Sequence, residues 1–534
     1  MKRLLAFVAV LSVMIGGTIH LSLLDHFMYT QMAMAAIMNH PNFNSPFLRP
    51  ESMARGPVVE SKPSQRKPLN ILVIYPDDWR HDSIGGVGPV VQTPFLNTLA
   101  RKGIRFTHNC VTTSICWISR ASYFTGQYAS RHKSMRLREP QFYKTWNTSW
   151  PGLLMQAGYF TGHVGKWQFA NPDRFIETHH FFNWTNLYEG YHWITGDKDY
   201  GRKPVHASDH SKDKAIQFLR LRPRDRPFSL TVAFYPPKAI GNSFVPGAQW
   251  SPKNGSMALY LNDTIPNPPD TWDRLPWFFP KYERAARSRW EERFQGSEKY
   301  QLSMKNYYRL ITEVDEATKK IISELKRQNI LNDTLIIFTT DNGYFHGEHG
   351  LGEFPCWVFY YAVECKVYHA KLRLMLSVSA GKWYPFQESI RVPLIIRDPR
   401  MPKEKYATLD DSFTLNIDLA PTILGAAAVY VPPDMQGRDI SDLYLLPSRS
   451  GNDLPWRDEF FYEYKLDNGK SMPMATALVR KDFKYIYWPQ FRYEQLFHLA
   501  EDPLEETDVF NDTKYRGVLQ GMRKRHRTLA VEVR

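Results

Sequence analysis

Five short apolar runs restrict the fold of this sequence more than any other feature. They are NILVIY (70–75), YFTGHVG (159–165), PFSLTVAFYPP (227–237), TLIIFTT (334–340) and VPLIIRDP (392–399). Runs in which apolar residues dominate without regular alternation are typical of strands buried on both faces of a parallel sheet. We therefore interpret these runs as strands of one sheet.

Segments with helical character separate these runs. Residues 93–103 read as a helix, and residues 306–329 form a longer one. Its apolar face contains Leu310, Val314, Ala317, Ile321 and Leu325. The alternation predicts an α/β domain over 69–400, with a large, mostly parallel or mixed sheet flanked by helices. Beyond residue 400, short aromatic strands and a terminal helix predict a smaller C-terminal α+β domain over 401–534.

The first 68 residues predict a secretory route. Residues 1–24 begin with basic residues and continue as an apolar run, which is typical of a signal peptide, with an uncleaved membrane anchor as the alternative. Residues 25–68 read as a linker. Six glycosylation sequons support the same route, at Asn147, Asn183, Asn254, Asn262, Asn332 and Asn511. We expect a glycoprotein that is secreted or lies in the secretory-pathway lumen, with membrane attachment only if the N-terminal segment stays uncleaved.

Charge and cysteine content narrow the classes of partner and of fold. The formal net charge of +14 permits an anionic partner such as an acidic polysaccharide. The alternative is a basic surface that contacts only solvent. We predict no nucleic-acid partner, because no nucleic-acid-binding motif is visible. Four cysteines in 534 residues are too few for a disulfide framework, so the hydrophobic core must hold the fold.

Two polar pairs follow two of the predicted strands. Asp77 and Asp78 come after the first run, and Asp341 and Asn342 come after the fourth. Open α/β sheets bind ligands at the carboxyl ends of their strands, and carboxylate and amide oxygens suit a hard cation such as calcium. Either pair alone fits a plain turn equally well. Both together predict a calcium site.

Several ordered motifs resemble those of sulfatases, the branch of the alkaline phosphatase superfamily whose nucleophile is a formylglycine made from cysteine. The resemblance runs from about residue 70 to near residue 510. The motifs are PDDWR, CWISRASYFTG, GYFTGHVGKW, TTDNGYFHGEHGL, KWYPFQESIRVPL and RKDFKYIYW…EQLFHLAEDPLEE. It implies an alkaline phosphatase-like fold, hydrolysis of sulfuric esters, a calcium cofactor and a formylglycine-generating enzyme as partner.

Cys116 stands at the position that this family converts to formylglycine (3-oxoalanine). The residues around it that match the family pattern are Ser119, Arg120, Thr125 and Gly126. Ile118 stands where proline or alanine is usual. A hydrated aldehyde at position 116 would attack sulfur with one hydroxyl, and the other would later expel sulfate. A helix predicted to begin near Ser119, together with Arg120, would bind the anion.

Lysines and histidines complete the site that the resemblance implies. Lys166 and Lys382 match positions that neutralise sulfate oxygens. Gln168 and Lys238 stand where the family commonly has histidines. Gln168 can only orient a group by hydrogen bonding, whereas Lys238 could protonate the departing alcohol if burial and neighbouring cations lower its pKa.

His346 and His349, in YFHGEHG, are alternative acids or substrate contacts, and a structural role is the competing interpretation for each.

Residues 353–380 interrupt two motifs that the family joins almost directly. This long apolar insertion holds Cys356 and Cys365, and such a loop is improbable at the edge of a compact domain. We interpret it as a retained intron of the gene model. If the segment is real, it forms a buried helix or a hydrophobic flap.

The sequence thus predicts a calcium-dependent sulfatase that acts on sulfate monoesters, and the resemblance implies a sulfated carbohydrate as substrate. Hydrolysis of phosphomonoesters or phosphonates is the enzymatic alternative, because the same site would hold tetrahedral phosphorus. A catalytically silent glycan-binding homologue is the alternative from another class, suggested by Ile118, Gln168 and the insertion.

Overall fold

The structure is a computed structural model, in which residues 64–534 fall in one unit. It describes residues 67–135, 146–168, 182–188, 192–195, 197, 199–201, 203–240, 247–282, 284–352, 382–445, 455–466 and 473–534. The predicted signal or anchor (1–24), nearly all of the linker (25–68) and the suspected insertion (353–380) lie outside these residues. Among the described residues, no helix combines the length and the apolar character needed to cross a membrane.

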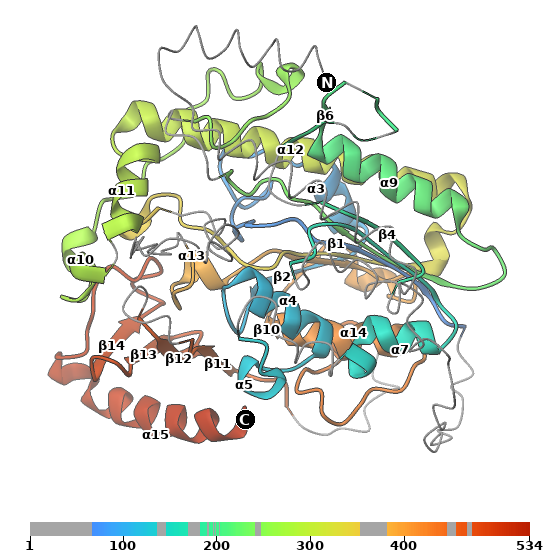
Figure 1. The fold of residues 1–534 in the computed structure, drawn as a ribbon. Helices are drawn as coiled ribbons and strands as arrows, with labels where there is room; N and C mark the ends of the chain where they lie inside the picture. Colours follow the sequence, from blue (N-terminus) through green and yellow to red (C-terminus); the bar gives the residue numbers. More distant parts are fainter. Residues whose placement is uncertain are drawn as a thin grey trace, which may run out of the picture. The chain divides into compact units, whose positions relative to one another are not determined.

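An eight-stranded sheet forms the centre of the unit (Figure 1). From edge to edge the strands are β10 (Thr408–Leu415), β2 (Ile104–Cys110), β9 (Leu394–Arg397), β8 (Thr334–Phe338), β1 (Asn70–Ile74), β7 (Phe228–Ala233), β3 (Phe160–Gly165) and β4 (Trp184–Leu187). β9 is antiparallel to both of its neighbours, and all the other pairs are parallel. All five apolar runs are strands of this sheet, which confirms the mostly parallel or mixed sheet expected from the sequence.

Helices cover both faces of the sheet. On one face lie α3 (Pro94–Arg101), α9 (Ala207–Leu221) and α12 (Ser297–Arg327), and on the other lie α4 (Cys116–Thr125), α7 (Trp150–Gln156) and α14 (Leu419–Ala426) (Figure 1). Alternate residues of β1 enter the two cores: Leu72 packs with α12, and Ile71 packs with α4 and α14. A strand that is apolar on both faces is therefore what this three-layer arrangement requires.

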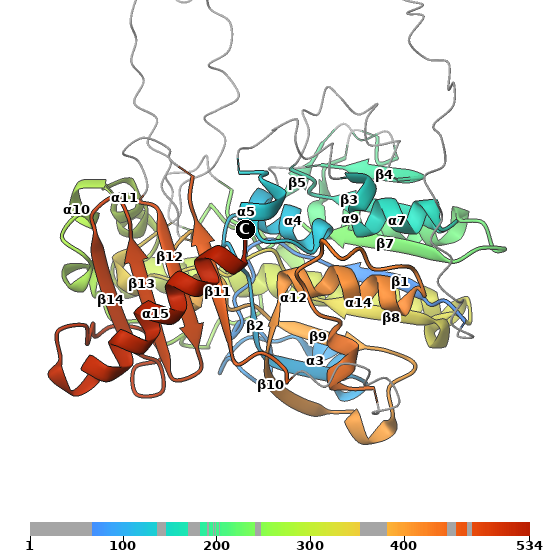
Figure 2. The ribbon, with the colours of Figure 1, turned by 90° about the horizontal axis from the view of Figure 1, so that it is seen from below.

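A second, four-stranded antiparallel sheet follows toward the C-terminus (Figure 2). Its strands are β11 (Glu459–Tyr464), β12 (Ala475–Arg480), β13 (Phe483–Trp488) and β14 (Tyr493–His498), and α15 (Arg516–Glu532) packs on one face. This is the expected α+β region. The strand β10 and the helix α14 lie after residue 400 but belong to the large sheet and its covering layer, so the smaller region begins later in the chain than that boundary.

Shorter elements connect these layers. They are α5 (Ala129–His132), β5 (Trp193–Ile194), β6 (Val205–His206), α10 (Phe279–Tyr282), α11 (Arg284–Arg293) and α13 (Gln387–Ile390).

Candidate active site

The charged residues predicted to act together meet at one edge of the large sheet. Four strands that run in the same direction end there: β1, β3, β7 and β8. The side chains that follow these four ends are Asp77 and Asp78, Lys166, Lys238, and Asp341 with Asn342, respectively. Parallel strands place their carboxyl ends together, so residues distant in sequence become neighbours.

Lys382 lies at the same edge, but it comes before its strand in the sequence, whereas the other residues come after theirs. It precedes β9 instead of following a strand, and β9 is antiparallel to β2 and β8. A strand that runs opposite to its neighbours begins at the edge of the sheet where those neighbours end. The position of Lys382 before its strand is therefore a consequence of the sheet topology.

Cys116 is the first residue of α4, which begins just after β2. The helix was expected to begin near Ser119, so it starts three residues earlier than predicted. Its N-cap residue is Ile115, and the helix ends at Gly126 in the left-handed conformation (φ 66°). An N-terminus at position 116 brings the helix dipole closer to an anion bound there.

The carboxylates of the site form a compact cluster with Cys116. One ligand atom each from Asp77, Asp78, Cys116 and Asp341 lies within 4.8 Å of the others. The side-chain amide of Asn342 donates to Asp78 Oδ1 at 2.6 Å, while its own Oδ1 is buried with no hydrogen-bond partner among the described residues. Clustered carboxylates and an unsatisfied amide oxygen fit a hard divalent cation such as calcium.

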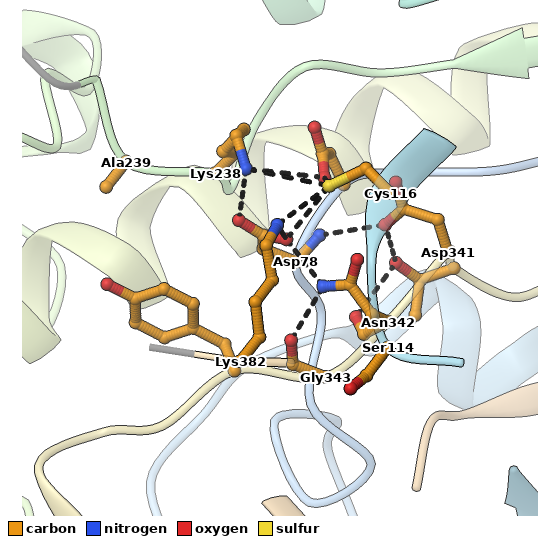
Figure 3. A network of polar contacts seen from close by, with 12 residues as sticks. Asp78, Ser114, Cys116, Lys238, Ala239, Asp341, Asn342, Gly343 and Lys382 are labelled. Atoms are coloured by element: carbon orange, nitrogen blue, oxygen red, sulfur yellow. Dashed lines mark hydrogen bonds and ion pairs between the residues drawn. The ribbon is translucent and has the colours of Figure 1, made fainter. Parts of the chain in front are cut away.

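Four cationic groups surround the three carboxylates. Figure 3 shows two of them, Lys238 and Lys382, beside Asp78 and Cys116. Lys166 pairs with Asp77, and Lys382 pairs with Asp78. Lys238 Nζ lies 2.6 Å from the other oxygen of Asp78.

The fourth cation, Arg120, lies 2.9 Å from Asp341 Oδ2. Lys382 Nζ and Lys238 Nζ also lie 2.8 Å and 3.9 Å from Cys116 Sγ. The positive charge in excess of the carboxylates suits an anionic ligand at position 116.

Burial and these charges compete in setting the protonation states. Burial alone would raise the pKa of Asp77, but Lys166, Lys238 and Lys382 hold it below its usual range. The pKa of Asp341 is also lowered, because Arg120 and the lysines outweigh the effect of burial. Burial raises the pKa of the Cys116 thiol to about 12. An unmodified Cys116 without a metal is thus a neutral thiol at pH 7 and a poor nucleophile.

Residues that the sequence analysis did not select hold this cluster in place. Tyr307, on α12, donates its hydroxyl to the carbonyl oxygen of Asp78 at 2.9 Å. Asn416 accepts from the backbone N–H of Thr112 at 3.1 Å and donates to Ser119 Oγ at 3.0 Å. The contacts span 229 to 304 positions in the chain, and neither residue lies in a motif that would have pointed to it.

Three further residues were predicted to contact the substrate: Gln168, His346 and His349. Gln168 lies two residues after Lys166, in left-handed backbone (φ 72°). His346 packs edge-on against the ring of Tyr307, with ring centroids 4.8 Å apart, and burial lowers its pKa to about 3. His349 stacks on Phe386, with centroids 4.4 Å apart.

The pKa of His349 is raised although burial would lower it, because Glu388 lies beside it. These contacts give both histidines partners within the fold. His346, with a pKa near 3, is a neutral imidazole at pH 7 and therefore not an acid for a leaving group.

Both parts of the chain match protein-family models. The family model described as Sulfatase matches residues 69–429, and the model described as N-sulphoglucosamine sulphohydrolase, C-terminal, matches residues 381–532. The two matches together cover nearly all described residues.

Curated proteins and solved structures agree with these matches. An N-acetylglucosamine-6-O-sulfatase of Bacteroides thetaiotaomicron is 24% identical over 518 residues, covering 84% of each chain. A structure described as a complex with its substrate D-glucosamine-2-N,6-O-disulfate has a TM-score of 0.64 at 22% identity and covers 88% of this chain and 98% of that chain. A phosphonate monoester hydrolase of Agrobacterium radiobacter has a TM-score of 0.63 at 20% identity, with 88% and 96% covered. These likenesses confirm the expected alkaline phosphatase-like fold.

Proposed function

Because this chain belongs to the sulfatase family, we propose that it hydrolyses sulfate monoesters of a sulfated carbohydrate, with calcium and a formylglycine made from Cys116. The carbohydrate preference is supported by the activity named for the Bacteroides relative and, more weakly, by the net charge of +14. One observation carries the proposal: three lysines and one arginine converge with three carboxylates around Cys116 Sγ, at the N-terminus of α4.

The cofactors would be held by the residues that cluster at the sheet edge. Carboxylate oxygens of Asp77, Asp78 and Asp341 and the amide oxygen of Asn342 would hold calcium. The formylglycine supplies a hydrated aldehyde as the nucleophile, which neither a neutral thiol nor a serine hydroxyl replaces.

The side chains of the chain itself bind and orient the sulfate group. Arg120 is fixed by Asp341 and by the carbonyl oxygen of Lys166 at 2.9 Å, so its guanidinium has a defined direction. Lys166 and Lys382 bring positive charge to the sulfate oxygens, where negative charge increases as the ester bond breaks. Lys238 is the candidate donor to the departing alcohol, from its place between Asp78 and Cys116.

Mass spectrometry of the peptide that contains Cys116 is the most direct test. We expect the aldehyde form in protein produced together with a formylglycine-generating enzyme. We also expect Cys116→Ala to abolish turnover of sulfate esters while leaving the thermal unfolding temperature within a few degrees. Turnover that persists in Cys116→Ala would overturn the assignment of the nucleophile.

Phosphomonoester or phosphonate hydrolysis is the second candidate, favoured by the likeness to a phosphonate monoester hydrolase. The same cations would bind a tetrahedral phosphorus group. Comparing kcat/KM for a sulfate monoester, a phosphate monoester and a phosphonate monoester on one preparation separates the activities. Binding of a sulfated glycan without turnover, together with an unmodified Cys116, would instead identify a catalytically silent glycan-binding protein.

We also propose that the protein enters the secretory pathway, on the strength of its N-terminal apolar run and its sequons. Glycosidase treatment of the protein from its native source, followed by mass measurement, tests this route.

A further inference from the structure

His192 contacts the loop that carries Lys238. Its Nε2 atom lies 2.8 Å from the carbonyl oxygen of Lys238, and its Nδ1 atom lies 3.0 Å from the backbone nitrogen of Ser251. A carbonyl oxygen only accepts and a backbone N–H only donates. His192 therefore carries its proton on Nε2, donates to Lys238 and accepts from Ser251. Its two partners determine the tautomer.

The imidazole ring of His192 is fixed by its surroundings. It is buried, and the rings of His206 and Tyr235 lie 6.2 Å and 5.8 Å from it. His206 Nε2 donates to the carbonyl oxygen of Ser251 at 3.2 Å, so the two histidines hold both backbone groups of that serine. Burial lowers the pKa of His192 to about 4, so the ring stays neutral at the pH of most assays.

Lys238 depends on its backbone position to reach the site. Its backbone N–H donates to Tyr235 at 3.1 Å, and the preceding Pro237 pairs with Asp77 as an isolated bridge. The ammonium group then lies 2.6 Å from Asp78 Oδ2 and 3.9 Å from Cys116 Sγ. A lysine side chain is flexible, so the position of its ammonium group depends on how firmly the backbone of the loop is held. His192 adds a hydrogen bond to this loop at the carbonyl oxygen of Lys238.

We propose that His192 is a positioning residue that acts through Lys238. By donating to the Lys238 carbonyl it keeps the ammonium group of that lysine between Asp78 and position 116, where the substrate anion binds. This inference rests on the proposed function only in that the anion is taken to be the reacting group of a sulfate ester. It assigns no proton transfer to His192.

The test compares His192→Phe, His192→Gln, Lys238→Met and the double variant His192→Phe/Lys238→Met. We expect His192→Phe to lower kcat by roughly 10- to 100-fold with a smaller change in KM, as small misplacements of reacting groups do. Glutamine can still donate to the carbonyl, so His192→Gln should recover most of the loss. If His192 acts through Lys238, the kcat of the double variant should be no lower than that of Lys238→Met. The loss of kcat in His192→Phe and in Lys238→Met should also depend in the same way on whether the substrate has a good or a poor leaving group.

A binding measurement keeps the inference separate from the proposed reaction. Titration calorimetry with inorganic sulfate in calcium buffer measures anion binding and needs no turnover. His192→Phe and Lys238→Met should each weaken sulfate binding, and the double variant should lose no more binding free energy than Lys238→Met. His526→Phe is the matched control, because His526 is also buried and bonded, to Thr476 in the C-terminal sheet. Additive losses, or a loss in His192→Phe that His526→Phe reproduces, would overturn the inference. Absence of any turnover in the native protein would sink the proposed function alone.

Discussion

The hydroxyl group of Tyr462 donates to the carbonyl oxygen of Trp383 at 2.6 Å. Tyr462 lies on β11 of the C-terminal sheet, and Trp383 is the residue after Lys382. The same hydroxyl lies 2.9 Å from Ser114 Oγ, two residues before Cys116. One phenol of the smaller sheet therefore holds two segments of the site that are about 270 positions apart in the chain.

We expect Tyr462→Phe to lower both the catalytic rate and the stability of the fold. The carbonyl oxygen of Trp383 would lose its donor, which should lower the free energy of unfolding by about 1 to 3 kcal/mol. The backbone next to Lys382 would loosen, and kcat should fall by roughly tenfold or more. Urea unfolding and steady-state kinetics measure the two effects. Tyr485→Phe is a suitable control, because Tyr485 bonds to Glu494 within the C-terminal sheet. An unchanged kcat in a destabilised Tyr462→Phe would show that this contact serves the fold alone.

The sequence predicted the parts of the site that lie in short motifs. Asp77 and Asp341 each follow a run that is apolar on both faces, so their meeting at one sheet edge followed from parallel strand direction. The start of α4 was predicted three residues late, because Cys116 and Trp117 give no capping signal and the N-cap is Ile115, which makes no side-chain cap bond.

The supporting residues could not be found in the same way. Tyr462 and Tyr307 have the appearance of ordinary core aromatics in the sequence, since hydrogen bonds across more than 200 positions leave no local pattern. The antiparallel direction of β9 likewise has no local signal, although it explains why Lys382 precedes its strand. Pairing direction is decided by the packing of the whole sheet.

Removing and restoring calcium should switch turnover off and on. After chelation the carboxylates of Asp77, Asp78 and Asp341 keep their lysine and arginine partners, so the fold should survive while activity is lost. Calcium at 100 times its dissociation constant should stabilise the protein by about 2.7 kcal/mol, which a thermal shift assay detects.

Asn342→Ala removes the unsatisfied amide oxygen and should weaken calcium binding by roughly 10- to 100-fold. Asn306→Ala is the control, because this buried asparagine bonds to Gly247 on another part of the fold. Equal calcium affinity in Asn342→Ala and the native protein would remove Asn342 from the proposed ligands.

Glu313 should make stability fall as pH rises toward 7. Burial raises its pKa to about 7, above its usual value near 4.5. Its Oε2 atom lies 3.3 Å from His206 Nδ1, which accepts from Ser208, so a protonated carboxyl suits this contact better than a carboxylate. A pKa raised in the folded state means that the fold binds the proton more tightly. The stabilisation is present below about pH 4.5 and is lost as pH rises through about 7.

Glu313→Gln keeps the acceptor for the backbone N–H of Lys253, bonded at 2.7 Å, without an ionisable group. We expect this variant to gain stability relative to the native protein at pH 8, on the order of 1 to 3 kcal/mol, and little at pH 5. Urea unfolding at the two pH values measures the difference. A gain of the same size at both would show that Glu313 does not change its protonation state over this range.

Replacing Ile118 should change how much of Cys116 is converted. Ile118 is the third residue of α4, and its side chain is fully buried in the cluster that also contains Trp117. Proline is tolerated in the first helical turn, so Ile118→Pro is compatible with this backbone. Losing the buried isoleucine in Ile118→Ala should cost about 2 to 5 kcal/mol of unfolding free energy. If the generating enzyme reads the segment before folding, both variants should raise the aldehyde fraction of the Cys116 peptide despite that cost.

Ile115→Ala provides the comparison for this effect, because Ile115 is equally buried but precedes Cys116 and lies outside the motif. Mass spectrometry of the peptide should show no rise in the aldehyde form for it. A native chain that is already fully converted would show that isoleucine at position 118 is no obstacle. A low aldehyde fraction that proline and alanine leave unchanged would place the obstacle elsewhere in the segment, and Trp117 would be the next residue to replace.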